Sequence, residues 1–390
     1  MMFQRACLAV IAVTVALTGC TPTPSPSDER RSTRRAQPTA WTVSFSEEGL
    51  YRGTAAEPQQ ILLVSGNVRI ETRRATPDGT ATLLAWSRSD STGVLRVDHT
   101  TGQVTPLHAT PGRHAVTLAV SGTMLAIGYQ RNPGGGIFQL DWTNPSPQSI
   151  GCSASDRVLS WHGATSLIVG NASTVYQVSV NGCGTEGRMS RDKRPEIIPS
   201  ADGQRIAYLE RDLVYNRTTR SYAPETTLYV GSGLSDSGAR AWMAGDKAPR
   251  DPVWSAAEQT LAFTYEDPNS EGRRRLLYLD AAAGELYQVP GLSRYADPVE
   301  NSPLWSPDGS SLAYERVYSS AQIAQIVVKP LAVAEPMVAF EGSDRMRLTG
   351  WASNSFLRAV DGDGHEVLLH VDGTTTIRAN APGTHLIPTR

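Results

Sequence analysis

The sequence has little excess charge of either sign, and very little lysine or cysteine. Its 390 residues carry a formal net charge of −2, only three of the 36 basic residues are lysine, and there are four cysteines. Without a basic excess the composition does not point to nucleic acid, and without an acidic block it does not point to a solvating tail. A charged partner would therefore have to meet a local patch.

The residues that are abundant predict a folded β protein. Hydrophobic residues make up 40% of the chain, which excludes a disordered polypeptide and supplies apolar material for a core. The 34 glycines and 25 prolines are more than long helices tolerate and are typical of many short strands joined by turns. We therefore expect an all-β fold.

The first part of the chain, residues 1–19, has the pattern of a signal peptide. Arg5 precedes an apolar stretch from Ala6 to Leu17, which is shorter than the ~20 residues of a permanent membrane span. The four residues from Leu17 to Cys20, LTGC, resemble the bacterial lipobox, in which the cysteine thiol receives a diacylglyceryl group and becomes the mature N-terminus. The resemblance implies lipid attachment at Cys20 and a location on the extracytoplasmic face of the bacterial cell membrane. The alternative is an ordinary secretory signal with an incidental cysteine.

Residues 20–40 are expected to form a lipidated, flexible tether. After the cysteine, proline alternates with serine and threonine, and four arginines follow. Nothing in this segment could build a core. Two buried acyl chains would anchor the protein stably where one would not. The folded domain is expected to occupy residues 41–390.

A repeated phrase in residues 41–390 predicts the architecture. It is clearest in PLWSPDGSSLAYERVY, from Pro303 to Tyr318, which reads as an apolar strand, Trp-Ser, an Asp-Gly turn and a second apolar strand. The apolar residue that opens the second strand recurs every 39 to 55 residues. A period of ~40–50 residues with several strands per unit is typical of a β-propeller, whose blades cannot bury their faces alone. The recurring positions are Leu84, Leu125, Leu167, Ile206, Leu261, Leu312 and Leu357.

The two ends of this domain are expected to share one blade. Residues 41–64 read as strands two, three and four of a unit, with Val43 standing 41 residues before Leu84. The segment THLIPTR, residues 384–390, could supply the missing first strand, and this pairing would close the ring. Seven complete units and one shared unit predict eight four-stranded blades. The alternative is seven blades, with the N-terminal segment as decoration.

Two short motifs carry a family resemblance. WSPDG at residues 305–309 and LAY at residues 312–314 resemble the WD40-like repeat family found in TolB-type propellers of bacterial envelope proteins, and the likeness extends over nearly all of 41–390. It implies that Asp-Gly makes turns and that the Trp, Leu and aromatic positions fill the blade interfaces. The chain lacks the separate N-terminal α/β domain of TolB, so TolB's role is not carried over, and the propeller fold itself hosts many functions.

Motifs for catalysis, cofactors and metals are incomplete. GCGTEG at residues 182–187 matches a dinucleotide fingerprint but opens no helix, and predicts a turn between strands three and four instead. GLSDS at 233–237 fails the nucleophile-elbow pattern. The seven histidines show no paired ligand spacing, and DGDG at 361–364 predicts a hairpin turn without the rest of a calcium loop. We expect no cofactor, no metal and no enzymatic activity.

The cysteines allow one disulfide. Cys7 would leave with the signal peptide and Cys20 would carry lipid, so Cys152 and Cys183 remain in an oxidising compartment. We predict that these two are bridged. The alternative is that they lie on opposite faces of the ring, farther apart than the ~7 Å between Cα atoms that a disulfide spans.

A partner-binding rim is predicted from the repeat spacing. The two largest intervals, 55 and 51 residues, arise from long connections between strands two and three, and a third connection follows in the next unit. Equivalent connections emerge on one face of a propeller, and these are rich in the Arg and Tyr typical of binding hot spots. The alternative is solvated loops that tolerate insertion. The predicted rim residues are Tyr215, Arg217, Arg220, Tyr222, Arg273, Arg274, Arg275 and Tyr318.

Two functions fit these features. We favour a membrane-anchored, monomeric and non-catalytic propeller that binds a protein or polymer partner in the cell envelope, because no catalytic motif is complete. The alternative is a propeller enzyme of lyase, lactonase or glycan-hydrolase type, or a small-ligand or glycan binder. Its residues would come from several blades and converge at one mouth of the central channel.

Overall fold

The computed structural model describes most of the predicted domain. All described strands belong to one compact unit, Pro38–Arg390, and no helix occurs in the described residues. These residues are 40–46, 49–54, 61–130, 136–152, 156–182, 184–194, 196–217, 220–234, 238–245, 249–255, 260–266, 274–289, 298–318, 321–343, 346–379 and 384–388.

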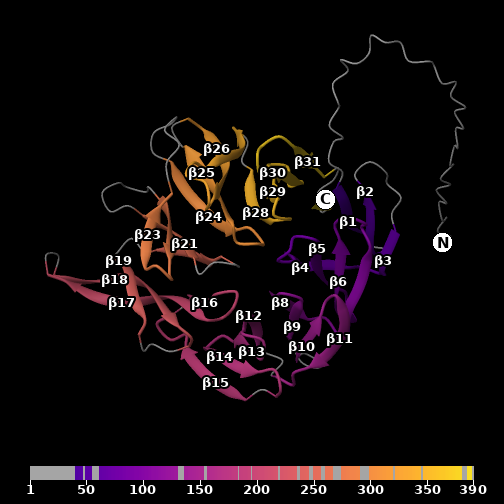
Figure 1. Cartoon of the computed structure of the whole chain (residues 1–390), viewed down its shortest axis with the longest axis horizontal. Helices are drawn as coiled ribbons and strands as arrows, with labels where there is room; N and C mark the ends of the chain where they lie inside the picture. Colours follow the sequence, from indigo (N-terminus) through magenta and orange to yellow (C-terminus); the bar gives the residue numbers. More distant parts are fainter. Residues whose placement is uncertain are drawn as a thin grey trace, which may run out of the picture. The chain divides into compact units, whose positions relative to one another are not determined.

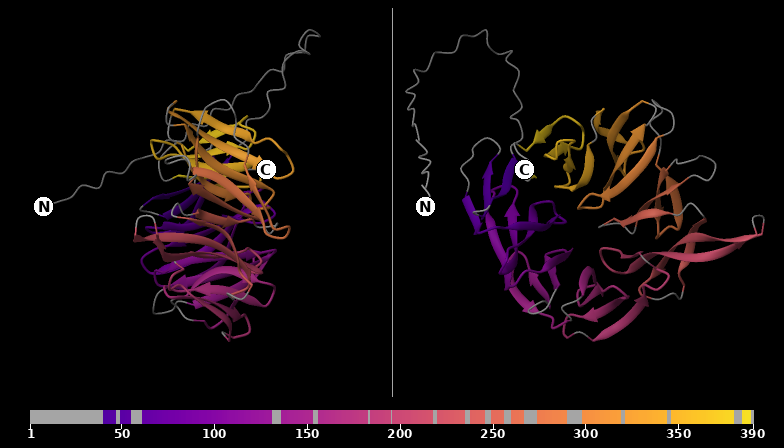
Figure 2. Two further views of the ribbon diagram at one scale, coloured as in Figure 1. Left: turned by 90° about the vertical axis from the view of Figure 1, so that its left-hand side faces the viewer. Right: turned by 180° about the vertical axis from the view of Figure 1, so that it is seen from behind.

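The described strands form eight antiparallel sheets of four strands each, arranged as the blades of a propeller around a central channel (Figure 1). We call them blades A to H. Blade A contains β32, β1, β2 and β3, and blades B to H follow in chain order from β4 to β31. The view from behind shows the same ring of twisted sheets (Figure 2). The prediction of an eight-bladed propeller is confirmed, and the seven-bladed alternative is wrong.

In each blade the first strand lies nearest the channel and the second lies beside it. The first strands are β4 (Arg69–Ala75), β8 (Ala115–Ser121), β12 (Arg157–His162), β16 (Glu196–Pro199), β20 (Arg250–Trp254), β24 (Val299–Trp305), β28 (Arg347–Trp351) and β32 (His385–Pro388). The second strands are β5 (Ala81–Ser87), β9 (Met124–Gln130), β13 (Ser166–Gly170), β17 (Arg205–Asn216), β21 (Thr260–Glu266), β25 (Ser311–Tyr318), β29 (Phe356–Val360) and β1 (Ala40–Ser46).

The remaining two strands of each blade complete the sheet outward. The third strands are β6 (Ser91–Asp98), β10 (Gly136–Asp141), β14 (Thr174–Ser179), β18 (Ser221–Ser232), β22 (Arg274–Asp280), β26 (Ile323–Pro330), β30 (Glu366–His370) and β2 (Gly49–Thr54). The fourth strands are β7 (Val104–Pro111), β11 (Asn144–Ser149), β15 (Thr185–Ser190), β19 (Arg240–Gly245), β23 (Glu285–Gln288), β27 (Met337–Gly342), β31 (Thr376–Arg378) and β3 (Ile61–Ser65).

Both ends of the domain enter blade A. Strand β32 pairs with β1 in a register that places Leu386 opposite Thr42 and Ile387 opposite Trp41. Val43 occupies the second strand and is fully buried, as the 41-residue offset predicted. The pairing removes an open edge from blade A, and the predicted sharing of one blade by the two termini is confirmed.

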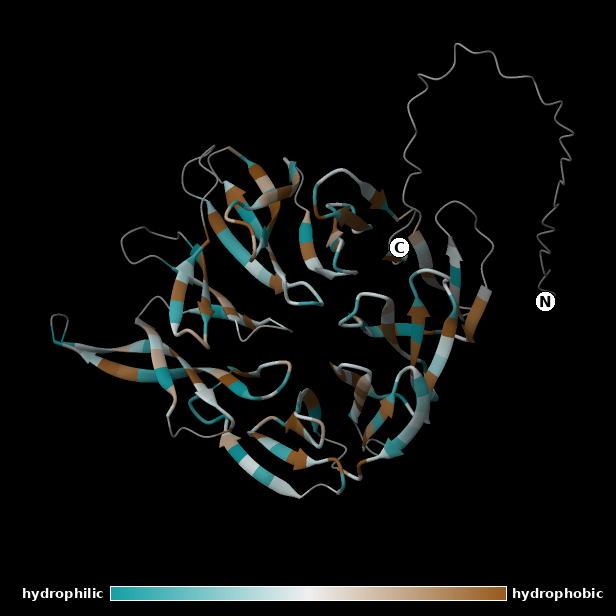
Figure 3. Cartoon of the chain, in the orientation of Figure 1, coloured by the Kyte–Doolittle hydropathy of each residue, from teal (hydrophilic) through white to brown (hydrophobic). Residues whose placement is uncertain are grey.

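The core consists of eight apolar clusters, one at each interface between neighbouring blades. All seven recurring positions predicted from the repeat are fully buried in these clusters or beside them. Figure 3 shows the same distribution as hydrophobic bands along the strands. Fully burying one such Leu or Ile side chain contributes ~1.5–3 kcal/mol, so each blade is stabilised by its two neighbours.

Four tryptophans also join the blades by hydrogen bonds. In each case the indole Nε1 donates to a backbone carbonyl on the first strand of the preceding blade, over 2.9 to 3.2 Å. Each ring thereby packs in a blade interface and fixes the spacing of two strands at the channel wall. The pairs are Trp161 to Ala119, Trp254 to Ile198, Trp305 to Val253 and Trp351 to Leu304.

The Asp-Gly turns follow directly after several first strands. Ser306 Oγ donates to Asp308 Oδ1 over 2.6 Å, and the backbone N–H of Ser310 donates to the same oxygen over 3.0 Å. Gly309 has a φ of 75°, a conformation that favours glycine. Comparable turns form around Asp78 and Asp202. The predicted Asp-Gly turns are confirmed, and they gather at one mouth of the channel.

Candidate functional site

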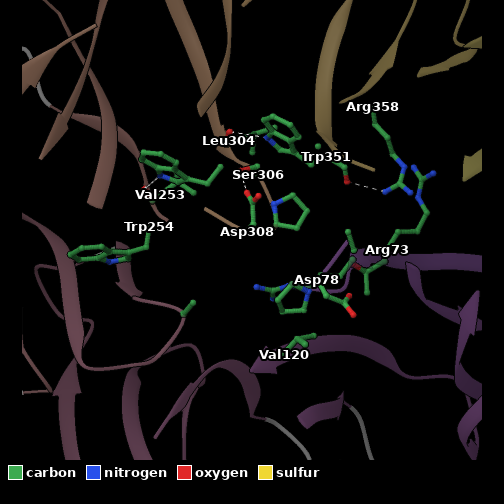
Figure 4. Close-up of a pocket in the computed structure, with 18 of the residues that line it drawn as sticks. Arg73, Asp78, Val120, Val253, Trp254, Leu304, Ser306, Asp308, Trp351 and Arg358 are labelled. Atoms are coloured by element: carbon green, nitrogen blue, oxygen red, sulfur yellow. Dashed lines mark hydrogen bonds between the residues drawn. The ribbon is translucent and has the colours of Figure 1, made fainter. Parts of the chain in front are cut away.

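The central channel contains a cavity of about 980 Å³, lined by first strands and by the turns that follow them. Figure 4 shows Arg73 and Arg358 next to each other at one side, away from Trp254. The turn residues Asp78 and Asp308 also line the cavity. Because its walls come from many blades, this cavity is the place where distant parts of the sequence can act together.

A buried ionic cluster lies where blades H, A and B meet. Arg73 Nη1, from β4, donates to both carboxylate oxygens of Glu366 on β30, over 2.8 and 2.6 Å. His385 Nδ1 lies 3.0 Å from Glu366 Oε2, and the backbone N–H of Leu386 donates to Oε1 over 3.0 Å. Arg358 Nε lies 3.5 Å from Oε1. The Glu366 carboxylate thus accepts hydrogen bonds from Arg73 and from the closing strand β32, and it forms an ion pair with Arg358.

The charges of this cluster do not cancel. Burial raises the pKa of Glu366, but the hydrogen bond from His385 and the charges of Arg73 and Arg358 outweigh it, and the pKa falls to about 2. Burial, together with the charge of Arg73, lowers the pKa of Arg358 to about 9, so the guanidinium stays charged at neutral pH. Burial also lowers the pKa of His385, which is therefore neutral there. One positive charge is left over.

A second feature is a β-hairpin that projects from the ring (Figures 1 and 2). Strands β17 and β18 have twelve residues each, whereas the other strands have three to eight. Beyond the last pairs with β16 and β19, residues 210–216 and 221–225 pair only with each other among the described strands. We call these two segments the hairpin arm.

One face of the hairpin arm is apolar and exposed. Leu213 lies opposite Pro224, and Tyr215 lies opposite Tyr222, so the four side chains share a face of the two-stranded ribbon. Leu213 and Tyr222 are 69% and 68% exposed. The two tyrosine rings meet edge to face with centroids 5.3 Å apart. The largest interval in the repeat therefore encodes strand, where the sequence predicted a connecting loop.

The structure divides the predicted rim residues. Tyr215, Arg217, Arg220 and Tyr222 are exposed at or beside the end of the hairpin arm. Arg274 and Arg275 are half-buried in β22, and Arg274 Nη1 donates to Asn301 Oδ1 in the next blade over 2.9 Å. Arg273 lies outside the described residues.

Tyr318 does not belong to an exposed rim. It is the last residue of β25, pairs with Ile323 of β26 and is fully buried. The charge of the buried Arg316 acts on its hydroxyl. Tyr318 was predicted in a connecting loop, but β25 extends through this residue.

The cysteine predictions fall partly on undescribed residues. Cys152 is disulfide-bonded. Its predicted partner Cys183 lies outside the described residues, so the pairing stays a prediction. Cys20, the predicted lipid site, also lies outside them. No described helix is both long and apolar enough for a membrane span.

The short motifs form turns. Residues 361–364 lie between β29 and β30, as predicted. Of residues 182–187, Gly182 and Gly184 lie between β14 and β15, the last three begin β15, and Cys183 is outside the described residues. Asp361 Oδ1 accepts hydrogen bonds from the backbone N–H groups of Asp363 and His365. In the described part of the chain no group of three His, Cys, Asp or Glu residues is placed to hold a metal ion.

Sequence reasoning missed the ionic cluster. Arg73 and Glu366 are 293 residues apart, so no local motif contains them. A usable signal existed in Arg358, the one charged residue of the buried strand FLRAV, because an isolated charge in such a strand needs a partner.

Comparison with known proteins identifies the architecture. Neither a family model nor a curated relative matches the sequence. Among solved structures, the chain is similar to the β-propeller domain of the trilobed protease from Pyrococcus furiosus, with 10% identity, coverage of 81% of this chain and 99% of that one, and a TM-score of 0.54. It is also similar to an oligogalacturonate lyase in complex with manganese, with 13% identity, coverage of 87% and 84%, and a TM-score of 0.44. A putative TolB from Agrobacterium tumefaciens shows 14% identity, coverage of 65% and 88%, and a TM-score of 0.39.

At 10% identity the likeness to the P. furiosus domain shows the β-propeller fold alone. The P. furiosus domain is described as having an open velcro topology, whereas β1 of this chain pairs with β32. The class of protein is therefore a closed, eight-bladed β-propeller.

Proposed function

We propose that this chain is a lipid-anchored protein of the bacterial cell envelope whose propeller binds a protein partner through the hairpin arm, without catalysis. The hairpin arm is the observation that carries the proposal. A two-stranded ribbon is marginally stable alone, and this one exposes apolar side chains on one face. Beyond Arg211, whose N–H donates to the Lys193 carbonyl, its edges pair with no further described strand. A partner could cover that face and pair with an edge.

The lipid anchor is proposed from the LTGC motif and the tether that follows it. Together they would hold the ring outside the membrane while leaving the hairpin arm accessible to other envelope proteins. The composition of residues 20–40 suits this role, because proline-rich segments favour extended conformations and supply no apolar side chains for a core.

A non-catalytic role is supported by the bonding of the acidic groups along the channel. Asp202 accepts hydrogen bonds from Ser200 and Gln204, and Glu71 accepts one from Ser87. The described carboxylates at this mouth therefore hold turns and strands together. A general acid or base would need a group able to reach a substrate proton.

The test is cross-linking in intact cells followed by mass spectrometry. We expect the wild-type chain to form discrete protein adducts through the hairpin arm, and the double variant Tyr215→Ser/Tyr222→Ser to lose them because the aromatic contact area is gone. Tyr287→Ser is the matched control, since Tyr287 is a 39% exposed aromatic on the outer strand β23. Equal adducts from the double variant and the control would refute the proposal.

A further inference from the structure

One charged side chain in the channel wall, Arg358, lacks hydrogen-bond acceptors for part of its guanidinium group. Arg358 is 4% exposed; its Nε lies 3.5 Å from Glu366 Oε1 without forming a hydrogen bond, and its Nη2 has no hydrogen-bond partner among the described residues. Its Nη1 reaches only the Trp351 carbonyl, over 3.4 Å. A buried guanidinium with two unsatisfied nitrogens is costly, since charged donors lose their water shell on burial. Such an arrangement is expected where a ligand completes the bonding.

Arg73 faces the same cavity from the neighbouring side. It uses Nη1 for both of its bonds to Glu366, and its side chain keeps 18% exposure. The two guanidinium groups are close enough that the charge of Arg73 acts on Arg358. Glu366 neutralises only one of them, so the pair presents a net positive charge to the cavity.

The acidic residues that line the cavity are bound elsewhere. Asp78 accepts hydrogen bonds from Thr76 and Thr80 within its own turn, and Asp308 accepts them from Ser306 and Ser310. Asp202 lies on a comparable turn and is bonded in the same way, whereas Glu71 lies on β4 with Arg73 and accepts a hydrogen bond from Ser87. The four lining carboxylates are thus held by bonds within their own turns or blade, and the unpaired positive charge is that of the Arg73, Arg358 and Glu366 group on blades B and H.

We propose that the channel binds a small anionic ligand whose oxyanion, a carboxylate or a phosphate, sits between Arg73 and Arg358. The planar guanidinium fork matches the geometry of both oxyanions and gives shorter, stronger hydrogen bonds than neutral donors do. The oxyanion would bond to Arg73, whose side chain keeps 18% exposure, and would offset the charge of the buried Arg358 behind its unpartnered Nη2. A ligand of this class goes beyond the protein-binding role proposed for the hairpin arm, and it uses no residue of that arm.

The test is calorimetric titration of the full-length chain, purified in detergent, with inorganic phosphate and separately with succinate at constant ionic strength. We expect saturable binding of at least one anion, and the preferred probe distinguishes a phosphate ligand from a carboxylate ligand. Arg73→Gln should weaken that binding at least tenfold. Arg378 is an exposed arginine on β31 that pairs with Asp361 and Asp363. Arg378→Gln should leave anion binding unchanged.

A second measurement covers the case in which Arg73→Gln fails to fold. Phenylglyoxal modifies accessible arginines, and mass spectrometry of the wild-type chain gives the rate at each site. The bound anion should slow modification of Arg73 several-fold and leave Arg378 unaffected. Absence of saturable binding by both anions, with an unchanged rate at Arg73, would overturn the proposal.

Discussion

At the scale of single residues, Glu366 joins the last complete blade to the closing strand and to blade B. It accepts bonds from Arg73 in blade B and from the backbone of Leu386 in β32, while its own strand belongs to blade H. Side chains from three blades are thereby fixed by one carboxylate. Removing one partner of a buried ion pair leaves the others charged and uncompensated.

We therefore predict that Glu366→Gln lowers the free energy of unfolding by about 3–5 kcal/mol at pH 7. Urea denaturation of wild type and variant measures this difference. The variant keeps the size of the side chain, so a cavity does not explain the loss. A difference below about 0.5 kcal/mol, the usual range for surface substitutions, would show that the cluster contributes little.

The same residue gives a pH dependence with a definite sign. The pKa of Glu366 is about 2 in the folded protein against an ordinary value of 4.5, so its contribution is complete above about pH 4.5 and is lost as the pH falls toward 2. The stability difference between wild type and Glu366→Gln should shrink over that window. A difference that stays constant from pH 6 to pH 2.5 would contradict the lowered pKa.

The sequence predicted the residues whose contacts are local but not those whose contacts join distant parts of the chain. The Asp-Gly turns were predictable because their bonding is local: Ser306, Asp308 and Ser310 lie within five positions of one another. The bond from Trp305 to Val253 spans 52 residues, and the pair Arg73 and Glu366 spans 293. Such contacts depend on which blades become neighbours, so only the burial of the tryptophans could be expected.

At the scale of elements, β32 has the greatest effect for its length. It has four residues, it is the only described strand that pairs with β1 on the channel side, and it supplies Leu386 and Ile387 to the interfaces of blade A with its neighbours. Since a propeller ring is stable only when each blade is covered on both sides, losing this strand exposes two interfaces at once.

We predict that Ile387→Ala lowers the free energy of unfolding by about 2–5 kcal/mol, because Ile387 is fully buried between blades A and B. Leu286→Ala is the control, since Leu286 is 39% exposed on the outermost strand β23 and should cost much less. Urea denaturation measures both. Hydrogen exchange should also speed up in β1 of the Ile387→Ala variant. A similar decrease in the free energy of unfolding in both variants would mean that the closing strand contributes no more to stability than an exposed outer strand does.

The hairpin arm shows where element prediction failed. The spacing of the repeat marked residues 211–225 as an insertion and predicted a long connection between strands two and three. Cross-strand pairing extends β17 and β18 through it nonetheless, up to the pair Asn216 and Ser221. Whether two strands go on pairing beyond the blade depends on tertiary context, and β-propensity predicts it poorly.

At the scale of the whole molecule, the number of blades was predictable for a physical reason. Each blade must bury both faces against its neighbours, so every unit repeats the same apolar positions at nearly the same spacing. The half-units at the two ends were recognisable because Val43 keeps that spacing from Leu84. The repeat says nothing about the channel cluster or the hairpin arm, because both depart from the positions that the blades share.

The proposed lipid anchor at Cys20 predicts how the protein is attached to the membrane. The apolar stretch before Cys20 is too short for a permanent membrane span, and no described helix could cross a membrane. In the proposed anchor, membrane attachment depends on the acyl chains. Each buried CH₂ group of these chains contributes ~0.8 kcal/mol. Cys20→Ser removes the thiol that would receive them, so we expect the variant to move from the membrane fraction to the soluble fraction.

Membrane fractionation with and without high salt measures this change. Cys152→Ser is the matched control, because it alters a cysteine of the propeller without touching the anchor. High salt screens the tether arginines, which could hold the chain at an anionic surface without any lipid. The Cys20→Ser variant should therefore be released completely in high salt, while wild type and Cys152→Ser stay bound. Persistence of Cys20→Ser in salt-washed membranes would show that attachment does not run through Cys20, and the ring would then be held at the membrane by its own surface or by a partner.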